Sequence, residues 1–93
     1  MPGKTRRFSY YWGSGVVAEE ARTQGEHHVP AIQLLVYDEG EAAGTTQVRF
    51  CHYDHKGRFQ RSPLLVGETE ILALRESLLA TPTLRALLRK LVE

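Results

Sequence analysis

Hydrophobic residues recur at every second position through the middle of the chain and at helical spacing near its end. From Thr45 to Asp54 the alternation predicts a strand, with Val48, Phe50 and His52 on one face and Gln47, Arg49, Cys51 and Tyr53 on the other. A β-branched, apolar run predicts another strand that starts near Pro30. Aromatic residues over 8–12 indicate a short strand that ends in a glycine turn, whereas 16–22 is ambiguous between a strand and a helical turn.

The alternating strand should be the first arm of a hairpin. The tripeptide His55-Lys56-Gly57 predicts a tight turn, because glycine supplies the positive φ that hairpin connections need. Residues 58–66 are then expected to return as a strand. Pro63 has no N–H to donate to a ladder, so this strand should lie at a sheet edge or be bulged there.

The end of the chain is predicted to be helical. Gly67 can cap a helix whose first turn is acidic, as the helix dipole prefers. Thr81 followed by Pro82 is typical of a second helix start, because proline at the first helical position loses no hydrogen bond. We therefore expect a C-terminal helix that is kinked or split at Pro82. Its apolar positions keep a helical spacing and include Ile71, Leu74, Leu78, Leu84, Leu87, Leu88 and Leu91.

Strands followed by helices predict an α+β fold, with an antiparallel sheet of about four strands and a helical C-terminal layer. The 93 residues suit a single domain over 1–93, with 1–7 as a flexible basic arm. Small domains leave much of their surface wet, so self-association would help such a chain.

Charge is unevenly distributed although the formal net charge is only +1. The arm over 1–7 carries +3, the stretch 8–46 carries −5, and the hairpin over 47–61 carries +3. A binding face of one sign is therefore compatible with a nearly neutral total.

The sequence also indicates the cellular compartment of the protein. Cys51 is its single cysteine, which excludes an intramolecular disulfide and favours a reducing compartment. No apolar run approaches the roughly 20 residues of a membrane span, and the basic start of the chain lacks the apolar centre of a signal peptide. We expect a cytoplasmic protein with no membrane partner.

Basic and aromatic residues in the hairpin offer the two ingredients of single-strand recognition: cations for phosphates and flat rings for bases. The alternative is that the rings belong to the core and the cations are simply solvated. The candidate phosphate contacts are Lys4, Arg6, Arg7, Arg49, Lys56, Arg58 and Arg61, and the candidate stacking residues are Tyr53 and Phe59.

Metal binding and catalysis are poorly supported. Cys51 and His52 are adjacent strand residues that point to opposite faces, and no paired cysteine or helical histidine motif supplies further zinc ligands. Ser14 lacks the elbow pattern of a nucleophile, and no phosphate loop or dinucleotide fingerprint is present. We expect no metal, no cofactor and no enzymatic activity.

The C-terminal leucines exceed what one small sheet needs, so some of them are candidates for a homodimer interface. The other interpretation is that they only cover the sheet. The candidate interface residues are Leu78, Leu84, Leu87, Leu88 and Leu91.

Residues 47–93 resemble the transcriptional coactivator family called positive cofactor four. The resemblance lies in an aromatic strand Val48–Tyr53, a glycine-containing hairpin, the apolar strand end Leu64–Val66 and an acidic helix start at Gly67–Glu70. It implies a curved four-stranded antiparallel sheet, dimerisation through the helices and single-stranded DNA across the sheets. Arg49, Tyr53, Arg58, Phe59 and Arg61 would inherit the nucleic-acid contacts. The sequence departs from the family at Gln60–Pro63 and in its second helical stretch.

The sequence thus predicts a non-catalytic, dimeric protein that binds single-stranded nucleic acid, with a role in transcription or DNA maintenance. The alternative is a protein–protein interaction module that uses a sheet edge or the leucine-rich helical face. Salt dependence separates the two, because phosphate contacts weaken steeply as salt rises.

Overall fold

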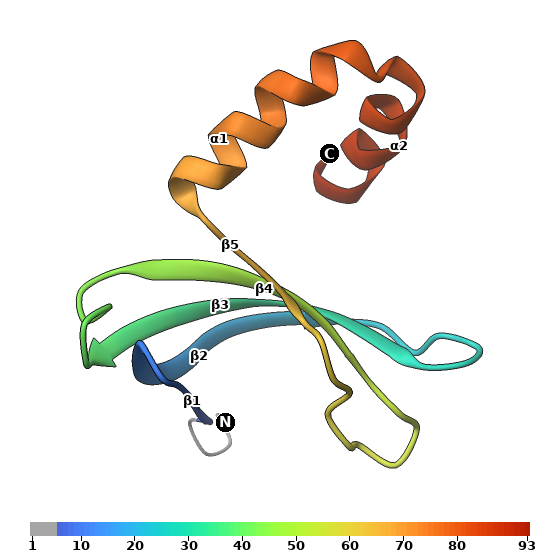
Figure 1. Cartoon of the computed structure of the whole chain (residues 1–93). Helices are drawn as coiled ribbons and strands as arrows, with labels where there is room; N and C mark the ends of the chain where they lie inside the picture. The colour runs from blue at the N-terminus through green and yellow to red at the C-terminus, as the bar shows by residue number, and fades with distance from the viewer. Residues whose placement is uncertain (1–5) are drawn as a thin grey trace.

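A computed structural model describes residues 6–93 as a five-stranded antiparallel sheet followed by helices (Figure 1). The α+β prediction is confirmed, but the expected number of about four strands is wrong. The ambiguous segment 16–22 belongs to a long second strand, because β-bulges let it follow the curvature of its neighbour. In chain order the strands are β1 (Arg7–Tyr10), β2 (Gly13–Arg22), β3 (Val29–Glu39), β4 (Thr46–Tyr53) and β5 (Leu64–Gly67), and each pairs with the next.

The C-terminal helical region is split rather than kinked, which was one of the two predicted arrangements. Helix α1 (Glu68–Ser77) continues into a short 3-10 helix, η1 (Leu78–Ala80), and α2 (Pro82–Val92) then starts afresh. Gly67 occupies the N-cap position of α1, and its N–H donates to Oε1 of Glu70 at 2.8 Å. Thr81 precedes α2, but its hydroxyl donates to the carbonyl of Leu78 at 3.2 Å instead of capping the helix.

The connection between β4 and β5 differs from the predicted hairpin. The expected return strand over 58–66 is wrong for residues 58–63, where only Phe59 bridges to Tyr53. Asp54 organises the turn: its Oδ1 accepts from the backbone N–H groups of Lys56 and Arg58, each at 2.9 Å. Side-chain bonds of this kind compete with ladder formation. Pro63 lies just before β5, outside the ladder, as its missing N–H predicts.

The two faces of the sheet have different surroundings. Every second residue of β3 from Val29 to Tyr37 is buried, and these side chains define the inner face. β1 and the β4–β5 loop lie on this side, and the helices lie on the other (Figure 1). The predicted alternation of β4 is confirmed, because Arg49, Cys51 and Tyr53 are all buried on the inner face. Ile32 and Phe50 pair with each other on the opposite, outer face.

At Gly15, β2 and β3 approach each other too closely for a side chain on β2. A Cβ atom built there would lie 1.9 Å from the carbonyl oxygen of Val36 and 2.8 Å from the Cα of Tyr37, both backbone atoms. We expect Gly15→Ala to reduce the free energy of unfolding by more than about 3 kcal/mol, within the range of the severest single substitutions. Chemical denaturation monitored by circular dichroism measures this loss.

Gly44→Ala is the matched control, because its Cβ would meet open space and only its left-handed φ of 88° is strained. It should cost about 1–2 kcal/mol. Equal losses for the two variants would contradict the proposed close approach at Gly15.

Candidate site on the inner face of the sheet

Arg49 lies at the centre of the inner face, with 7% of its surface exposed. Its Nε donates to Oε1 of Gln33 at 2.7 Å, and its Nη1 donates to the hydroxyl of Tyr10 at 3.0 Å. The ion pairs found among residues 6–93 do not include Arg49. The hydrogen bonds of this buried cation therefore go to neutral oxygens, and no carboxylate among the described residues forms an ion pair with it.

Gln33 connects Arg49 to the rest of the face. Only 1% of Gln33 is exposed, and its Nε2 donates to Oε2 of Glu20 at 2.7 Å and to the hydroxyl of Tyr53 at 2.9 Å. With its Oε1 bound to Arg49, the amide orientation is fixed by partners at both ends. The network spans β2, β3 and β4, so it sets the relative placement of three strands.

Glu20 collects the cations at the edge of this network. It forms ion pairs with Arg6 at 2.8 Å and with Arg22 at 2.9 Å. Burial raises the pKa of Glu20, but hydrogen bonds from Arg22, Gln33 and Arg6 outweigh it and lower the pKa to about 2. Glu20 is therefore ionised at neutral pH, and it forms its ion pairs with Arg6 and Arg22 rather than with Arg49.

A cleft of about 470 Å³ opens beside Arg49 between β1 and the β4–β5 loop. The guanidinium carbon of Arg49 lies 4.8 Å from the ring centroid of Phe59, whose ring is in turn 5.5 Å from that of Tyr53. Phe59 remains 43% exposed, which leaves part of its ring available to a ligand. The cleft therefore combines a buried cation with an accessible aromatic ring. Its lining includes Arg6, Arg7, Tyr10, Arg49, Tyr53 and Phe59.

Tyr10 extends the aromatic lining away from Arg49. Its ring stacks on that of Trp12 with centroids 4.9 Å apart and planes within 3°. The indole Nε1 of Trp12 donates to the hydroxyl of Tyr37 at 2.8 Å, which fixes the indole against the core. The buried Tyr37 thus positions the aromatic wall of the cleft, because it binds Trp12 and Trp12 stacks on Tyr10.

The sequence-predicted cations have different surroundings. Arg7 forms a bidentate pair with Asp38 at 2.8 and 3.1 Å, and Nε of Arg58 donates to Oδ2 of Asp54 at 2.7 Å. Lys56 and Arg61 are exposed in the loop, away from the cleft lining. Lys4 lies outside the described residues. Arg6 and Arg7, expected in a flexible arm, instead join the sheet, since the carbonyl of Arg6 accepts from the N–H of Val17 and Arg7 starts β1.

Sequence reasoning missed Gln33, Glu20 and Tyr10 as members of the site. Gln33 is the one polar residue within the apolar run of β3, and that interruption was the available signal. Glu20 and Tyr10 carry no comparable signal, because their roles depend on the pairing register of β1, β2 and β3.

Cys51 is buried and lies two residues after Arg49, on the same face of β4. Burial raises the pKa of the Cys51 thiol, despite the opposing effect of Arg49. The sulfur is therefore a protonated thiol near neutral pH and a weak nucleophile. Across residues 6–93, no three His, Cys, Asp or Glu side chains gather in a way that could hold a metal ion.

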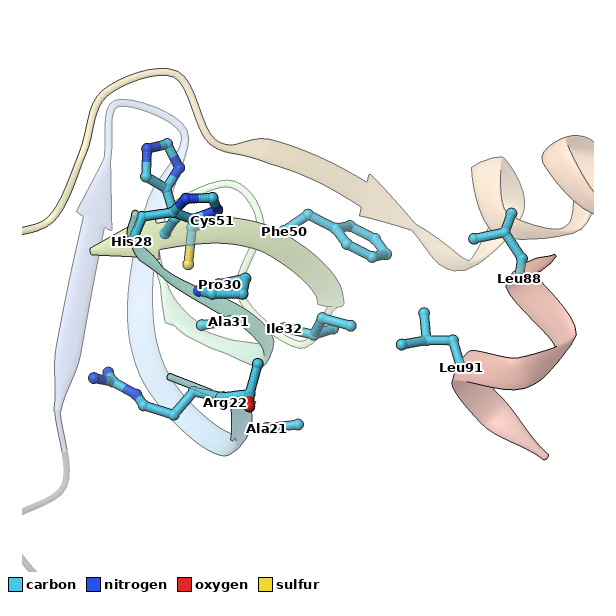
Figure 2. A pocket seen from close by; sticks show the side chains of 12 residues that line it. Ala21, Arg22, His28, Pro30, Ala31, Ile32, Phe50, Cys51, Leu88 and Leu91 are labelled. Atoms are coloured by element: carbon cyan, nitrogen blue, oxygen red, sulfur yellow. The ribbon is translucent and has the colours of Figure 1, made fainter. Parts of the chain in front are cut away.

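A second cleft, of about 660 Å³, lies on the outer face (Figure 2). Leu88 and Leu91 of α2 point across it toward Ile32 and Phe50 of the sheet. Its lining is predominantly apolar. The predicted interface leucines Leu84, Leu87, Leu88 and Leu91 are exposed, and Leu78 is half-buried.

Comparison of the chain with protein-family models, with curated proteins and with solved structures finds no match in any of the three. The resemblance to the positive cofactor four family therefore stays a prediction. None of the helices within residues 6–93 is long and apolar enough to cross a membrane.

Replacement of Gln33 by leucine tests the network. Gln33→Leu leaves Nε of Arg49 and the hydroxyl of Tyr53 without their buried partner, which should lower the free energy of unfolding by roughly 2–4 kcal/mol. Urea denaturation measures the loss. Gln24→Leu, at an exposed position of the β2–β3 turn, should change it by less than about 0.5 kcal/mol. Similar values for both variants would argue against a structural network.

Glu20 makes stability depend on pH in a predictable direction. The folded state lowers the pKa of Glu20 from 4.5 to about 2, so its contribution is present above pH 4.5 and is lost as pH falls toward 2. Glu20→Gln should therefore cost roughly 1–3 kcal/mol at neutral pH. The difference from wild type should disappear near the folded pKa.

Thermal unfolding of both proteins across this pH range provides the measurement. Glu41→Gln, at an exposed position of the β3–β4 turn, is the control and should follow the wild-type profile. A constant difference between wild type and Glu20→Gln at every pH would contradict the assignment.

Proposed function

We propose that the protein binds single-stranded nucleic acid, without catalysis, through the cleft of the inner face. The observation that carries this proposal is Arg49, a buried guanidinium that no carboxylate neutralises among residues 6–93. Hydrogen bonds between arginine and phosphate are charge-assisted and gain strength where water is excluded. A phosphate in the cleft would compensate the charge that the fold leaves open.

Phe59 supplies the second half of the proposal. Phe59 is 43% exposed beside Arg49, where a base could stack on its ring while the phosphate of that nucleotide approaches the guanidinium. Stacking contributes about 1–3 kcal/mol per base and tolerates any base sequence. A cleft of about 470 Å³ suits one nucleotide unit, which favours a single strand over a duplex.

The remaining cations would extend the contact along the strand with unequal strength. Lys56 and Arg61 are exposed in the β4–β5 loop and can meet flanking phosphates. Arg6, Arg7 and Arg58 are already paired with carboxylates, so phosphate must compete with Glu20, Asp38 and Asp54 for them. We therefore expect affinity in about the micromolar range, because few charges are free to act.

Replacement of Arg49 by methionine tests the proposal. Arg49→Met should weaken binding of a fluorescein-labelled single-stranded oligonucleotide at least tenfold in an anisotropy titration. It should also lower the slope of log K against log salt by about 0.7, the value for one phosphate contact on a single strand. Phe59→Leu should weaken binding by about 1–3 kcal/mol with the slope unchanged.

The control is Arg75→Met, which removes the same charge from the exposed surface of α1 and should leave affinity and slope as in wild type. Circular dichroism of each variant separates loss of binding from loss of fold. Absence of salt-sensitive binding by the wild-type protein, or equal binding by Arg49→Met, would overturn the proposal.

A protein-interaction module is the second candidate function. The specific observation in its favour is the apolar surface of α1, η1 and α2, where Leu72, Leu79 and Leu87 are each more than half exposed. Helical surfaces of this kind are uncommon on isolated soluble chains.

A further inference from the structure

We propose that the outer-face cleft is filled by a second copy of the chain, in a two-fold dimer where leucine side chains from α2 of each copy enter the cleft of the other and α1 of each copy lies beside α2 of the other. This proposal is independent of nucleic-acid binding, because it concerns the opposite face of the sheet. It commits to self-association rather than to a foreign partner or an apolar small molecule.

The first support is the apolar stripe of α2, which the chain itself leaves uncovered. Leu84, Leu87, Leu88 and Leu91 recur at the spacing of one helical face, and each is at least 39% exposed. Both α1 and α2 lie wholly within the described part of the chain, and neither contains a buried residue. An amphipathic helix gains most of its stability by burying its apolar face, so these helices require a covering surface.

The second support is the matching surface on the sheet. Ile32 and Phe50 face α2 across a cleft of about 660 Å³, and Phe50 is 40% exposed although it lies mid-strand (Figure 2). The cleft has room for several side chains but not for a whole helix. We infer that the partner inserts side chains of its leucine stripe, between the sheet and Leu88 and Leu91.

The third support is the exposed area of the chain. A compact monomer of 10.5 kDa exposes about 5,400 Å², whereas this chain exposes 7231 Å². Even if fully exposed, residues 1–5 would account for at most about 800 Å² of this area. About 1,000 Å² or more per chain is therefore exposed in excess of a compact monomer. Burial of that area by two copies reaches the lower end of the range for obligate dimers. The radius of gyration, 14.7 Å against about 12 Å for a compact chain, agrees.

The fourth support is the charge of the two helices, which selects the occupant. α1 carries Glu68, Glu70 and Glu76 against Arg75, whereas α2 carries Arg85, Arg89 and Lys90 before Glu93. A two-fold axis places acidic α1 beside basic α2 twice, so one operation satisfies both charges and both apolar surfaces. A foreign partner would have to supply the same combination.

Sedimentation equilibrium of the full chain over about 1–100 μM tests the proposal. We expect the wild type to have the mass of a dimer. Leu91→Glu should raise the dimer dissociation constant at least tenfold, because it places a charge in the cleft. Ala43→Glu, which places the same charge at an exposed position of the β3–β4 turn, is the matched control and should sediment as wild type.

A charge exchange tests the pairing of α1 with α2 and does not depend on whether Leu91→Glu folds. Glu68→Lys with Glu76→Lys makes α1 basic, and Arg85→Glu with Arg89→Glu makes α2 acidic. Each double variant alone should dimerise at least tenfold more weakly than wild type, and an equimolar mixture should recover the dimer.

Four results would overturn the proposal. They are a monomeric wild type over the whole concentration range, an open-ended series of larger masses, dimerisation of Leu91→Glu equal to wild type, and dimerisation of the separate charge variants equal to wild type. Oligonucleotide is absent from every sample, so these results leave the proposed nucleic-acid function untouched.

Discussion

Arg49 carries a full positive charge into the concave side of the sheet, where neutral oxygens and one aromatic ring meet it. Desolvating a cation is costly, so the fold must supply compensating dipoles with good geometry. Gln33 is the main compensating group, and it needs Glu20 and Tyr53 to hold its own orientation. Three strands are therefore placed relative to one another by a polar network as much as by the apolar core.

The outer face is organised differently, because the side chains that line its cleft are mainly apolar and few polar contacts fix their orientation. Apolar side chains of β3, β4 and α2 face a shared space without meeting. α1 leaves the sheet directly from β5, so the direction of the helices is set by a single chain connection at Gly67. The side chains of the inner face are thus held in place by contacts within one chain, whereas the apolar surface of α1 and α2 stays exposed.

Local patterns predicted those parts of the fold in which neighbouring residues decide the structure. Alternation predicted the faces of β4, and the Thr81-Pro82 pair predicted the helix break. The loop over 58–63 was missed, because Asp54 captures the backbone of the turn and ends the ladder early. Arg49 and Phe59 were predicted as site residues, but Gln33 and Glu20 were not. Their roles depend on cross-strand register and on which carboxylate each arginine meets, and neither can be deduced from spacing alone.

The stacking of Trp12 on Tyr10 has a practical consequence. Trp12 is the only tryptophan of the chain, and the hydroxyl of Tyr10 accepts a hydrogen bond from Arg49. A ligand that draws the guanidinium toward the cleft would disturb Tyr10 and thereby the surroundings of the indole. The intrinsic fluorescence of the unlabelled protein is therefore a built-in optical reporter of the inner face.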